Sequence, residues 1–201
     1  MSHFTLHQHS FSGHSHRVAL MLSLLGLPYN EVVVDLAKGE QKSASFLALN
    51  PLGQVPVLQD GDNVITDSNA ILIYLATRYD PNRSWLPTAP LTQAKVQGFL
   101  SLTAGLLLDG PGALRLKTMF GAAIDESRAQ QKTAQLLSYL ERLLQQADWL
   151  VGDKVTIADV AMYSYIKLAP QGGVDLTPFG AVQSWLQRIE ALPGYIAPAC
   201  L

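Results

Sequence analysis

The sequence predicts two domains, a small mixed α/β domain followed by an all-helical one. Within the first 80 residues, short β-branched and alternating apolar runs are separated by helical stretches. Three prolines then mark a connecting segment, PNRSWLPTAP, beyond which strand patterns nearly vanish. We therefore expect an α/β domain over residues 1–80, a linker over 81–90 and a helical domain over 91–201.

The first strand, helix and second strand are expected within residues 3–36. Residues 3–8 alternate apolar and polar positions, and a largely apolar helix over 15–26 ends at Gly26 and Pro28. The run EVVVDL over 31–36 is β-branched and apolar, as is typical of a strand inside a sheet. A strand, helix and strand in this order favour a parallel pair joined by a right-handed crossover.

The rest of the first domain is predicted to add a hairpin and a helix. A short apolar segment covers 46–49, and two strand candidates, 55–59 and 63–66, flank Asp60-Gly61-Asp62, which is a hairpin signal. A helix capped by Thr66 or Asp67 should then run to about Tyr79. The sequence thus predicts a four-stranded mixed sheet with helices on its faces.

The second domain should consist of helices alone. Helical periodicity covers residues 91–108, 127–146, 156–168 and 178–192. The segment Asp109-Gly110-Pro111-Gly112 must break or kink the first of these helices, because proline cannot donate a helical hydrogen bond.

Thr156-Ile157-Ala158-Asp159 reads as a capping box at the start of a helix, in which each of the two polar residues bonds the backbone of the other. It predicts a folding element rather than a binding site. Replacing Asp159 with Ala should destabilise the protein by about 0.5–2 kcal/mol.

Composition and charge exclude several classes of protein. Charged residues make up 15% of the 201 residues, against an average near 25%, which suggests that a second subunit covers some surface. The net charge of -2 and the scattered Lys and Arg residues exclude the basic footprint of a nucleic-acid-binding protein. The chain shows no signal peptide and no apolar run of about 20 residues, and its one cysteine, Cys200, cannot form an internal disulfide. We expect a cytoplasmic protein with no membrane partner.

The most specific local pattern is NPLGQVPVL over residues 50–58. Pro56 has no N–H for a sheet ladder, so it should lie at an edge or serve a purpose. If the Val55–Pro56 bond is cis, Val55 would expose its N–H and C=O, and an extended peptide could pair with them like an added strand. Residue type alone favours the other interpretation, a trans proline in an edge strand.

Several motifs together resemble the cytosolic glutathione S-transferase superfamily. They are NPLGQVPVL followed by Asp67-Ser68, the segment LLGLPY ending the first helix, and Val151-Gly152 through Thr156-Ile157-Ala158-Asp159 to Tyr163. These motifs lie in order, at spacings typical of the family, and span nearly the whole chain. The resemblance implies a thioredoxin-like first domain, a homodimer, and glutathione as co-substrate.

The resemblance also implies roles for individual residues. Val55, before a cis Pro56, would offer its backbone to the cysteinyl unit of glutathione, and Asp67 and Ser68 would hold its γ-glutamyl end. Without the resemblance, Asp67-Ser68 could equally be a plain helix cap. Further glutathione contacts are expected from Ser10, His14, Gln41, Lys42 and Gln54, with His14 or His16 adding positive charge to the cleft.

The first strand–helix junction should carry the group that activates the glutathione thiol. Aligning His16-Arg17-Val18 with the start of the family's first helix places Ser12 at the activating hydroxyl, as in a bacterial serine-type member. Ser10 and Ser15 are the competitors, and Ser15 could simply cap the helix. The junction holds no cysteine, which excludes a mechanism based on a protein thiol.

The predicted function is attack of the activated thiol on a hydrophobic electrophile. Candidate lining of the electrophile pocket, expected between the domains, includes Leu107, Arg115 and Met119. A glutathione-dependent reductase or peroxidase and a non-catalytic binding or regulatory protein are the alternatives. The pairs His7-x-His9 and His14-x-His16 could suggest a metal, but zinc normally needs three or four protein ligands, so we expect none.

Overall fold

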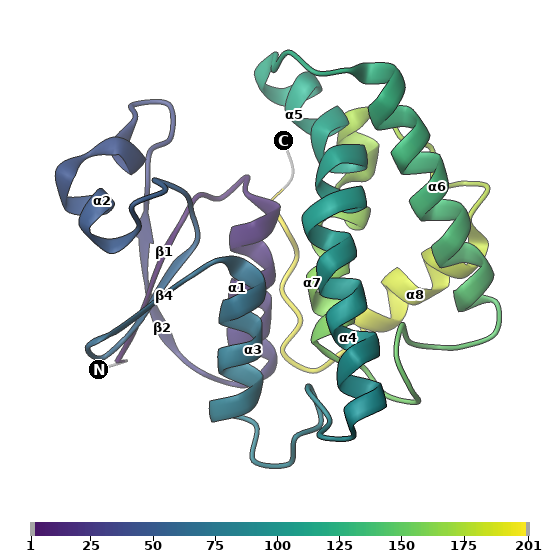
Figure 1. Cartoon of the computed structure of the whole chain (residues 1–201), viewed down its shortest axis with the longest axis horizontal. Helices are drawn as coiled ribbons and strands as arrows, with labels where there is room; N and C mark the ends of the chain where they lie inside the picture. The colour runs from purple at the N-terminus through teal and green to yellow at the C-terminus, as the bar shows by residue number, and fades with distance from the viewer. Residues whose placement is uncertain (1–2, 200–201) are drawn as a thin grey trace. The chain divides into compact units, whose positions relative to one another are not determined.

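The computed structural model describes residues 3–199 and divides into two compact units (Figure 1). Of the described residues, 3–81 and 193–199 form one unit, and 82–192 form the other. The division near residue 81 agrees with the start of the predicted linker. The C-terminal segment differs from the prediction, because residues 193–199 belong to the α/β unit. Cys200 lies outside the described residues.

A four-stranded mixed sheet forms the centre of the first unit, as predicted. Its strands are β1 (Phe4–Gln8), β2 (Tyr29–Val33), β3 (Val57–Asp60) and β4 (Asn63–Thr66), in the order β2-β1-β3-β4. β1 is parallel to β2 and antiparallel to β3, and β3 and β4 form the expected hairpin. The register aligns His7 with Val57 and Val57 with Thr66. The end of β1, the start of β3 and the end of β4 therefore lie at the same edge of the sheet.

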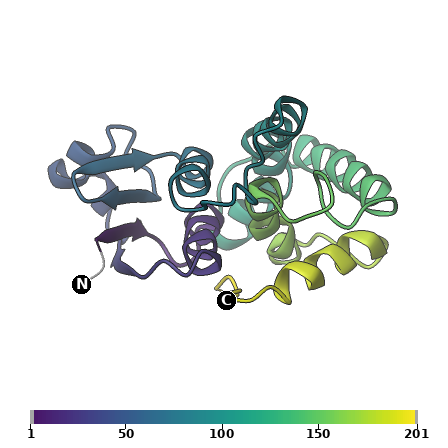
Figure 2. The same cartoon turned by 90° about the horizontal axis from the view of Figure 1, so that it is seen from below.

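The two faces of this sheet are covered unequally (Figures 1 and 2). Helices α1 (Gly13–Leu24) and α3 (Ser68–Arg78) pack together on one face, where Phe4, Leu6 and Leu58 are buried. The other face carries η1 (Glu40–Lys42) and the six-residue α2 (Ala44–Leu49), over a small core of Val34, Phe46 and Val57. A short helix covers less area than two long ones, so part of this second face stays open.

The position of β2 in the sheet differs from the prediction. Its β-branched run indicated an interior strand, but β2 is an edge strand, and Val32 and Val33 are 40% and 56% exposed. β-branched side chains fit any pleated surface, whether or not a neighbour covers it, so this pattern cannot separate an edge strand from an interior one.

Several boundaries also differ from the prediction. The second strand spans Tyr29–Val33 and not 31–36, and two other differences have local reasons. β3 begins at Val57 and not at Val55, because Pro56 cannot donate to the ladder. α1 begins at Gly13, two residues earlier than expected, because Ser12 rather than Ser15 is its N-cap.

The second unit is entirely helical in its described elements, as predicted. These are α4 (Pro90–Leu102), the π-helical segment η2 (Thr103–Gly112), α5 (Ala113–Phe120), α6 (Glu126–Leu144), α7 (Ile157–Lys167), η3 (Ala169–Gly172) and α8 (Gly180–Glu190). The expected break falls at Gly110, whose backbone is non-helical at φ -98° and ψ -105°. Among the helices of residues 3–199, none has the length and apolarity needed to cross a membrane.

The capping box at the start of α7 is present, with Thr156 as the N-cap and Asp159 returning its bond. The Asp159 carboxylate has two partners that the sequence did not indicate. It accepts hydrogen bonds from the Leu150 N–H at 3.0 Å and from Trp185 Nε1 at 2.9 Å. Asp159 therefore ties the loop before α7 to the helix α8.

A second buried carboxylate, Asp60, stabilises the end of the sheet remote from the junction of β1 and α1. Tyr74 Oη donates to Asp60 Oδ2 at 2.6 Å, Tyr79 Oη donates to the same oxygen, and His3 Nε2 lies 3.2 Å from Oδ1. Burial opposes ionisation of Asp60, but the hydrogen bonds from Tyr74 and Tyr79 outweigh it and lower the pKa of this carboxyl.

We expect this cluster to make the protein acid-sensitive. The pKa of Asp60 is lower in the folded chain than in the unfolded one, so its stabilisation is present above about pH 4 and is lost as the pH falls through the folded value. Asp60→Asn should cost about 1–3 kcal/mol at pH 7 and should flatten the pH dependence below pH 4. Urea unfolding at several pH values measures both effects. Asp62→Asn is the matched control, because Asp62 is exposed. If the free energy of unfolding depended on acid pH equally in wild type, Asp60→Asn and Asp62→Asn, the assignment of Asp60 would be contradicted.

Candidate functional site

The predicted site residues of the first unit gather at one edge of the sheet. The loop after β1 holds Ser12, the segment before β3 holds Val55 and Pro56, and the start of α3 holds Ser68. The strand register brings these three segments to the same edge. Direct contacts also join α1 to α3, since His14 Nδ1 lies 3.1 Å from Ser68 Oγ and Arg17 donates to the same oxygen at 3.2 Å.

Ser12 has the geometry of a hydroxyl donor. Its Oγ accepts a hydrogen bond from the Ser15 N–H at 3.2 Å, so the oxygen is held at the N-terminus of α1. A hydroxyl that accepts in this way keeps its own proton to donate. The side chain is half-buried, between solvent and the helix end.

The two competing serines are placed differently. Ser10 lies exposed in a turn that the Ser12 N–H closes with the His9 carbonyl at 2.9 Å. Ser15 is buried, and its Oγ accepts from the His9 N–H at 3.3 Å. Ser15 therefore braces the loop, and the interpretation of Ser15 as the helix N-cap is wrong.

The start of α3 combines a strained cap with a buried hydroxyl. Asp67 adopts φ 69°, rare for a residue with a side chain, and its Oδ1 accepts from the N–H groups of Asn69 and Ala70, both at 2.9 Å. The cap interpretation of Asp67 is therefore confirmed. Its second oxygen, Oδ2, lies on an exposed side chain and adds an acceptor. Ser68 is buried and points back to α1 through its bonds to His14 and Arg17.

Arg17, and not the expected histidine, supplies the positive charge at this end of α3. Its guanidinium is 0% exposed, and Nη1 donates to Ser68 Oγ and, at 2.9 Å, to Asn69 Oδ1. The sequence contained a signal for this role. An arginine inside an otherwise apolar helix, HRVALMLSLL, must find partners because a buried charge is costly.

His14 and His16 are neutral at physiological pH, so the expectation that they add positive charge is wrong. Burial, and secondarily the nearby Arg17, lowers the pKa of His14 to about 3. Burial likewise lowers the pKa of His16 to about 4. His16 Nε2 donates to the carbonyl of Ile196 at 3.0 Å, so it fastens the C-terminal segment to α1. His14, by contrast, faces Ser68.

These shifts predict that stability falls with acidification well above the titration of carboxylates. Between pH 6.5 and 4, His14 and His16 bind protons in the unfolded chain but remain unprotonated in the folded chain. Protons therefore favour the unfolded state, and the free energy of unfolding decreases as the pH falls. Urea unfolding at pH 7, 6 and 5 should show this dependence of the free energy of unfolding on pH. His16→Gln should reduce the number of protons taken up on unfolding by about one. An unchanged slope in the variant would mean that His16 titrates normally in the folded protein.

The segment before β3 is organised by Asn50 and closed by a cis peptide bond. Asn50 is buried, its Nδ2 donates to the Gln54 carbonyl at 2.8 Å, and its Oδ1 accepts from the Leu52 N–H at 3.1 Å. The Val55–Pro56 bond is cis, as the resemblance implies and contrary to the expectation from residue type alone. Among the backbone hydrogen bonds that the described loops and turns form, none involves the N–H or the C=O of Val55.

Gln41 and Lys42 lie in η1, beside this segment. Lys42 Nζ donates to the Leu52 carbonyl at 3.2 Å. Gly53 makes the approach possible, because a Cβ there would lie 2.7 Å from Lys42 Nζ and 2.8 Å from the Gln41 carbonyl, and its φ is +62°. The Gln54 side chain is exposed. All three predicted polar contacts thus belong to the α/β unit.

The predicted electrophile residues belong to the helical unit. Leu107 is fully buried in η2, Met119 is half-buried in α5, and Arg115 is buried with its Nε donating to Gln171 Oε1 at 2.7 Å. Their role in a pocket stays a prediction. Within residues 3–199, no three His, Cys, Asp or Glu side chains gather as metal ligands.

Known protein families match both units of the chain. The glutathione S-transferase N-terminal domain matches residues 11–78 and the C-terminal domain matches residues 112–193. Glutathione S-transferase 2 of Schizosaccharomyces pombe is 32% identical, over 96% of this chain and 93% of its own length.

Solved structures agree with these matches. A glutathione S-transferase from Pseudomonas fluorescens superposes with a TM-score of 0.90 at 29% identity, covering 99% of this chain and 100% of its own. The glutathione transferase URE2P8 from Phanerochaete chrysosporium, solved with oxidized glutathione, reaches a TM-score of 0.83 at 33% identity, covering 96% and 92% of the two chains. With a thioredoxin-like α/β unit followed by a helical one, and with similarity along almost its entire length, the chain belongs to the glutathione S-transferase superfamily.

Proposed function

We propose that this protein is a glutathione transferase, which activates the thiol of glutathione for attack on a hydrophobic electrophile. The observation that carries the proposal is the convergence of the Ser12 hydroxyl, the Val55 backbone and the Ser68 hydroxyl at one edge of the sheet. Relatives that match 96% and 84% of the chain are named glutathione S-transferases, which supports the same reaction class.

The peptide part of glutathione would bind as an added strand. The N–H and C=O of Val55 suit the two complementary groups of the cysteinyl unit. The γ-glutamyl carboxylate would lie at the start of α3, where Ser68 Oγ and the helix N-terminus favour a negative charge. Asp67 Oδ2 would meet the ammonium group beside it, while Oδ1 keeps its capping role.

Further contacts are proposed on the same unit. Gln41, Lys42 and Gln54 would bind the glycyl carboxylate, which agrees with the positive charge of Lys42. Ser10 and His14 would border the cysteinyl and γ-glutamyl parts, with His14 acting as a neutral group.

Ser12 would stabilise the thiolate by donating its hydroxyl proton to the sulfur. A thiol with a reference pKa near 8.5 is only about 3% ionised at pH 7. Lowering this pKa by about two units requires roughly 2.7 kcal/mol. A hydroxyl donor to a charged acceptor supplies about 1.5–3 kcal/mol, and the N-terminus of α1 adds about 0.3–1 kcal/mol. One hydroxyl at the helix N-terminus is therefore sufficient.

The electrophile would bind against the helical unit, at a pocket that includes Leu107, Arg115 and Met119. In the reaction, the thiolate forms a carbon–sulfur bond while the leaving group departs with the electron pair of the broken bond. We further propose a cytoplasmic homodimer, in keeping with the low share of charged residues.

Retention on immobilised glutathione, followed by turnover of a chromogenic electrophile, tests the proposed function. Wild type should be retained and active, whereas Ser68→Ala should bind glutathione about tenfold more weakly, because a hydrogen bond to a charged carboxylate is lost. Retention without turnover over a broad electrophile panel would favour a non-catalytic binding protein. Turnover of peroxides or disulfides alone would favour the reductase alternative.

A further inference from the structure

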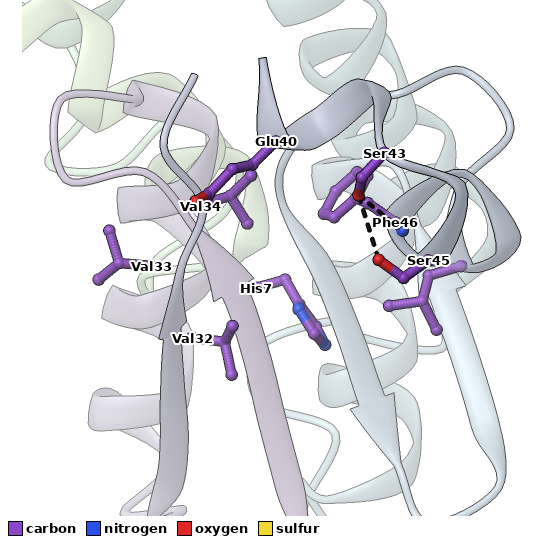
Figure 3. A pocket seen from close by; sticks show the side chains of 9 residues that line it. His7, Val32, Val33, Val34, Glu40, Ser43, Ser45 and Phe46 are labelled. Carbon is purple, nitrogen blue, oxygen red and sulfur yellow. Dashed lines mark hydrogen bonds between the residues drawn. The ribbon is translucent and has the colours of Figure 1, made fainter. Parts of the chain in front are cut away.

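A hollow of about 390 Å³ opens on the α2 face of the sheet (Figure 3). Its volume falls within the range of about 300–1,000 Å³ that is typical of small-molecule sites. Nine residues line it: His7, Val32, Val33, Val34, Glu40, Ser43, Ser45, Phe46 and Leu49. None of them is among the proposed glutathione contacts, so the hollow is a separate feature of the α/β unit.

The hollow results from the unequal covering of the sheet. α2 is six residues long, and it buries Phe46 against Val34 and Val57 at one end of the strands. The next position of β2 on this face, Val32, remains 40% exposed and lies opposite His7 on β1. The open part of the face and the side of α2 form the walls.

The lining of the hollow fits the aromatic ring of a small ligand. Five of the nine lining residues are apolar, and Val32, Val34 and Phe46 among them lie on the α2 face of the sheet. The His7 ring at the floor meets the Phe46 ring edge-on, with centroids 6.2 Å apart and an angle of 78° between the planes. Figure 3 shows the His7 ring lying between Val32 and α2. A flat apolar ring that enters here would contact both aromatic and aliphatic surfaces.

Two of the four polar lining residues, His7 and Glu40, offer acceptors to a ligand, while the hydroxyls of Ser43 and Ser45 bond each other at 3.2 Å. His7 Nε2 lies 2.7 Å from Gln59 Oε1, and an amide oxygen can only accept, so Nε2 carries the proton. In the neutral ring, Nδ1 is then an acceptor. Glu40 is held in place because its Oε2 accepts from the Asp35 N–H at 2.7 Å. Among the described lining residues, Glu40 is the formally charged one, and it is negative.

From this combination we propose that the hollow is a second ligand site, which binds a small aromatic ammonium compound. The aromatic body occupies the space between the β2 valines and α2, and the ammonium donates to the acceptors of His7 and Glu40. Binding here does not compete with glutathione, because the two sites share no residue.

Titration of the isotope-labelled full chain with 2-phenylethylamine, followed by NMR, tests the proposal. Amide resonances of residues 32–34 and 46–49 should shift to saturation, with the same affinity in the absence and presence of saturating glutathione. The near-isosteric anion 3-phenylpropionate should bind at least fivefold more weakly. Shifts located elsewhere, competition with glutathione, or equal binding of the anion would each overturn the proposal.

Three variants separate this site from nonspecific binding. Val32→Lys should weaken the amine tenfold or more, because it fills the hollow with a like charge. Val64→Lys is the matched control, since Val64 is 42% exposed at the opposite edge of the sheet and should have no effect. Glu40→Gln keeps an acceptor for the Asp35 N–H but removes the negative charge. It should lower the preference for 2-phenylethylamine over 3-phenylpropionate about two- to fivefold. Equal effects of Val32→Lys and Val64→Lys, or an unchanged preference in Glu40→Gln, would contradict the assignment.

Discussion

Replacing Ser12 with alanine is expected to lower turnover with a chromogenic electrophile by at least tenfold, while glutathione binding largely persists. The hydroxyl is proposed to contact the sulfur, whereas the Val55 backbone and Ser68 would hold the peptide. Loss of about 1.5–3 kcal/mol of thiolate stabilisation corresponds to roughly 10- to 150-fold less thiolate at a fixed pH below the pKa. Steady-state kinetics, together with calorimetric glutathione binding, measure the two effects separately.

Because Ser12 also caps α1, the variant needs controls for folding. Loss of an N-cap costs about 0.5–2 kcal/mol of stability, so thermal unfolding should be measured beside activity. Ser12→Thr retains both the hydroxyl and the cap and should recover most of the activity. Ser10→Ala removes an exposed hydroxyl of the same loop, which is proposed to border glutathione but not to contact the sulfur, so its turnover should fall much less than that of Ser12→Ala. If Ser10→Ala were inactive and Ser12→Ala active, the roles of the two serines would be exchanged.

Replacing Asp159 with alanine should destabilise the helical unit by about 3–5 kcal/mol, more than a helix cap alone would predict. The carboxylate is 0% exposed and accepts from the Leu150 N–H, the Thr156 N–H and hydroxyl, and Trp185 Nε1. Without it, three buried N–H groups lose their partner, and each unsatisfied group costs about 1–3 kcal/mol. This is a large part of a typical free energy of unfolding of about 5–15 kcal/mol.

Urea denaturation and thermal melting measure this loss, with a melting temperature lower by roughly 10 °C. Asp153→Ala is the matched control, because Asp153 is exposed in the same loop and should change stability by less than about 0.5 kcal/mol. A cost below 1 kcal/mol for Asp159→Ala would show that water replaces the carboxylate.

The fold could be predicted because several local signals agreed with one another. The Asp-Gly hairpin, the proline linker and the helical periodicity each fix an element, and their order leaves few arrangements of a small sheet. The edge position of β2 could not be predicted, because it depends on how much of the sheet the six-residue α2 covers. The wider turns of η2 were likewise not evident, since proline and glycine indicate a break but not its form.

The candidate site was predictable where a residue acts through the backbone or a helix end. The cis Val55–Pro56 bond followed from the family resemblance and not from residue type, whereas the cap at Asp67 followed from its position before an apolar helical run. The role of Arg17 depends on the packing of α1 against α3, which places its guanidinium beside Ser68. The neutral state of His14 has the same origin, because the burial that lowers its pKa is a tertiary property.

The pKa of the thiol of bound glutathione tests the central claim most directly. Thiolate absorbance in the ultraviolet, recorded as a function of pH for glutathione bound to wild type and to Ser12→Ala, gives this value. The proposed mechanism predicts a pKa of about 6.5 in wild type, roughly two units below the reference thiol, and a return toward 8.5 in the variant. The same lowered pKa in both proteins would contradict the assignment of Ser12 as the thiolate-stabilising residue.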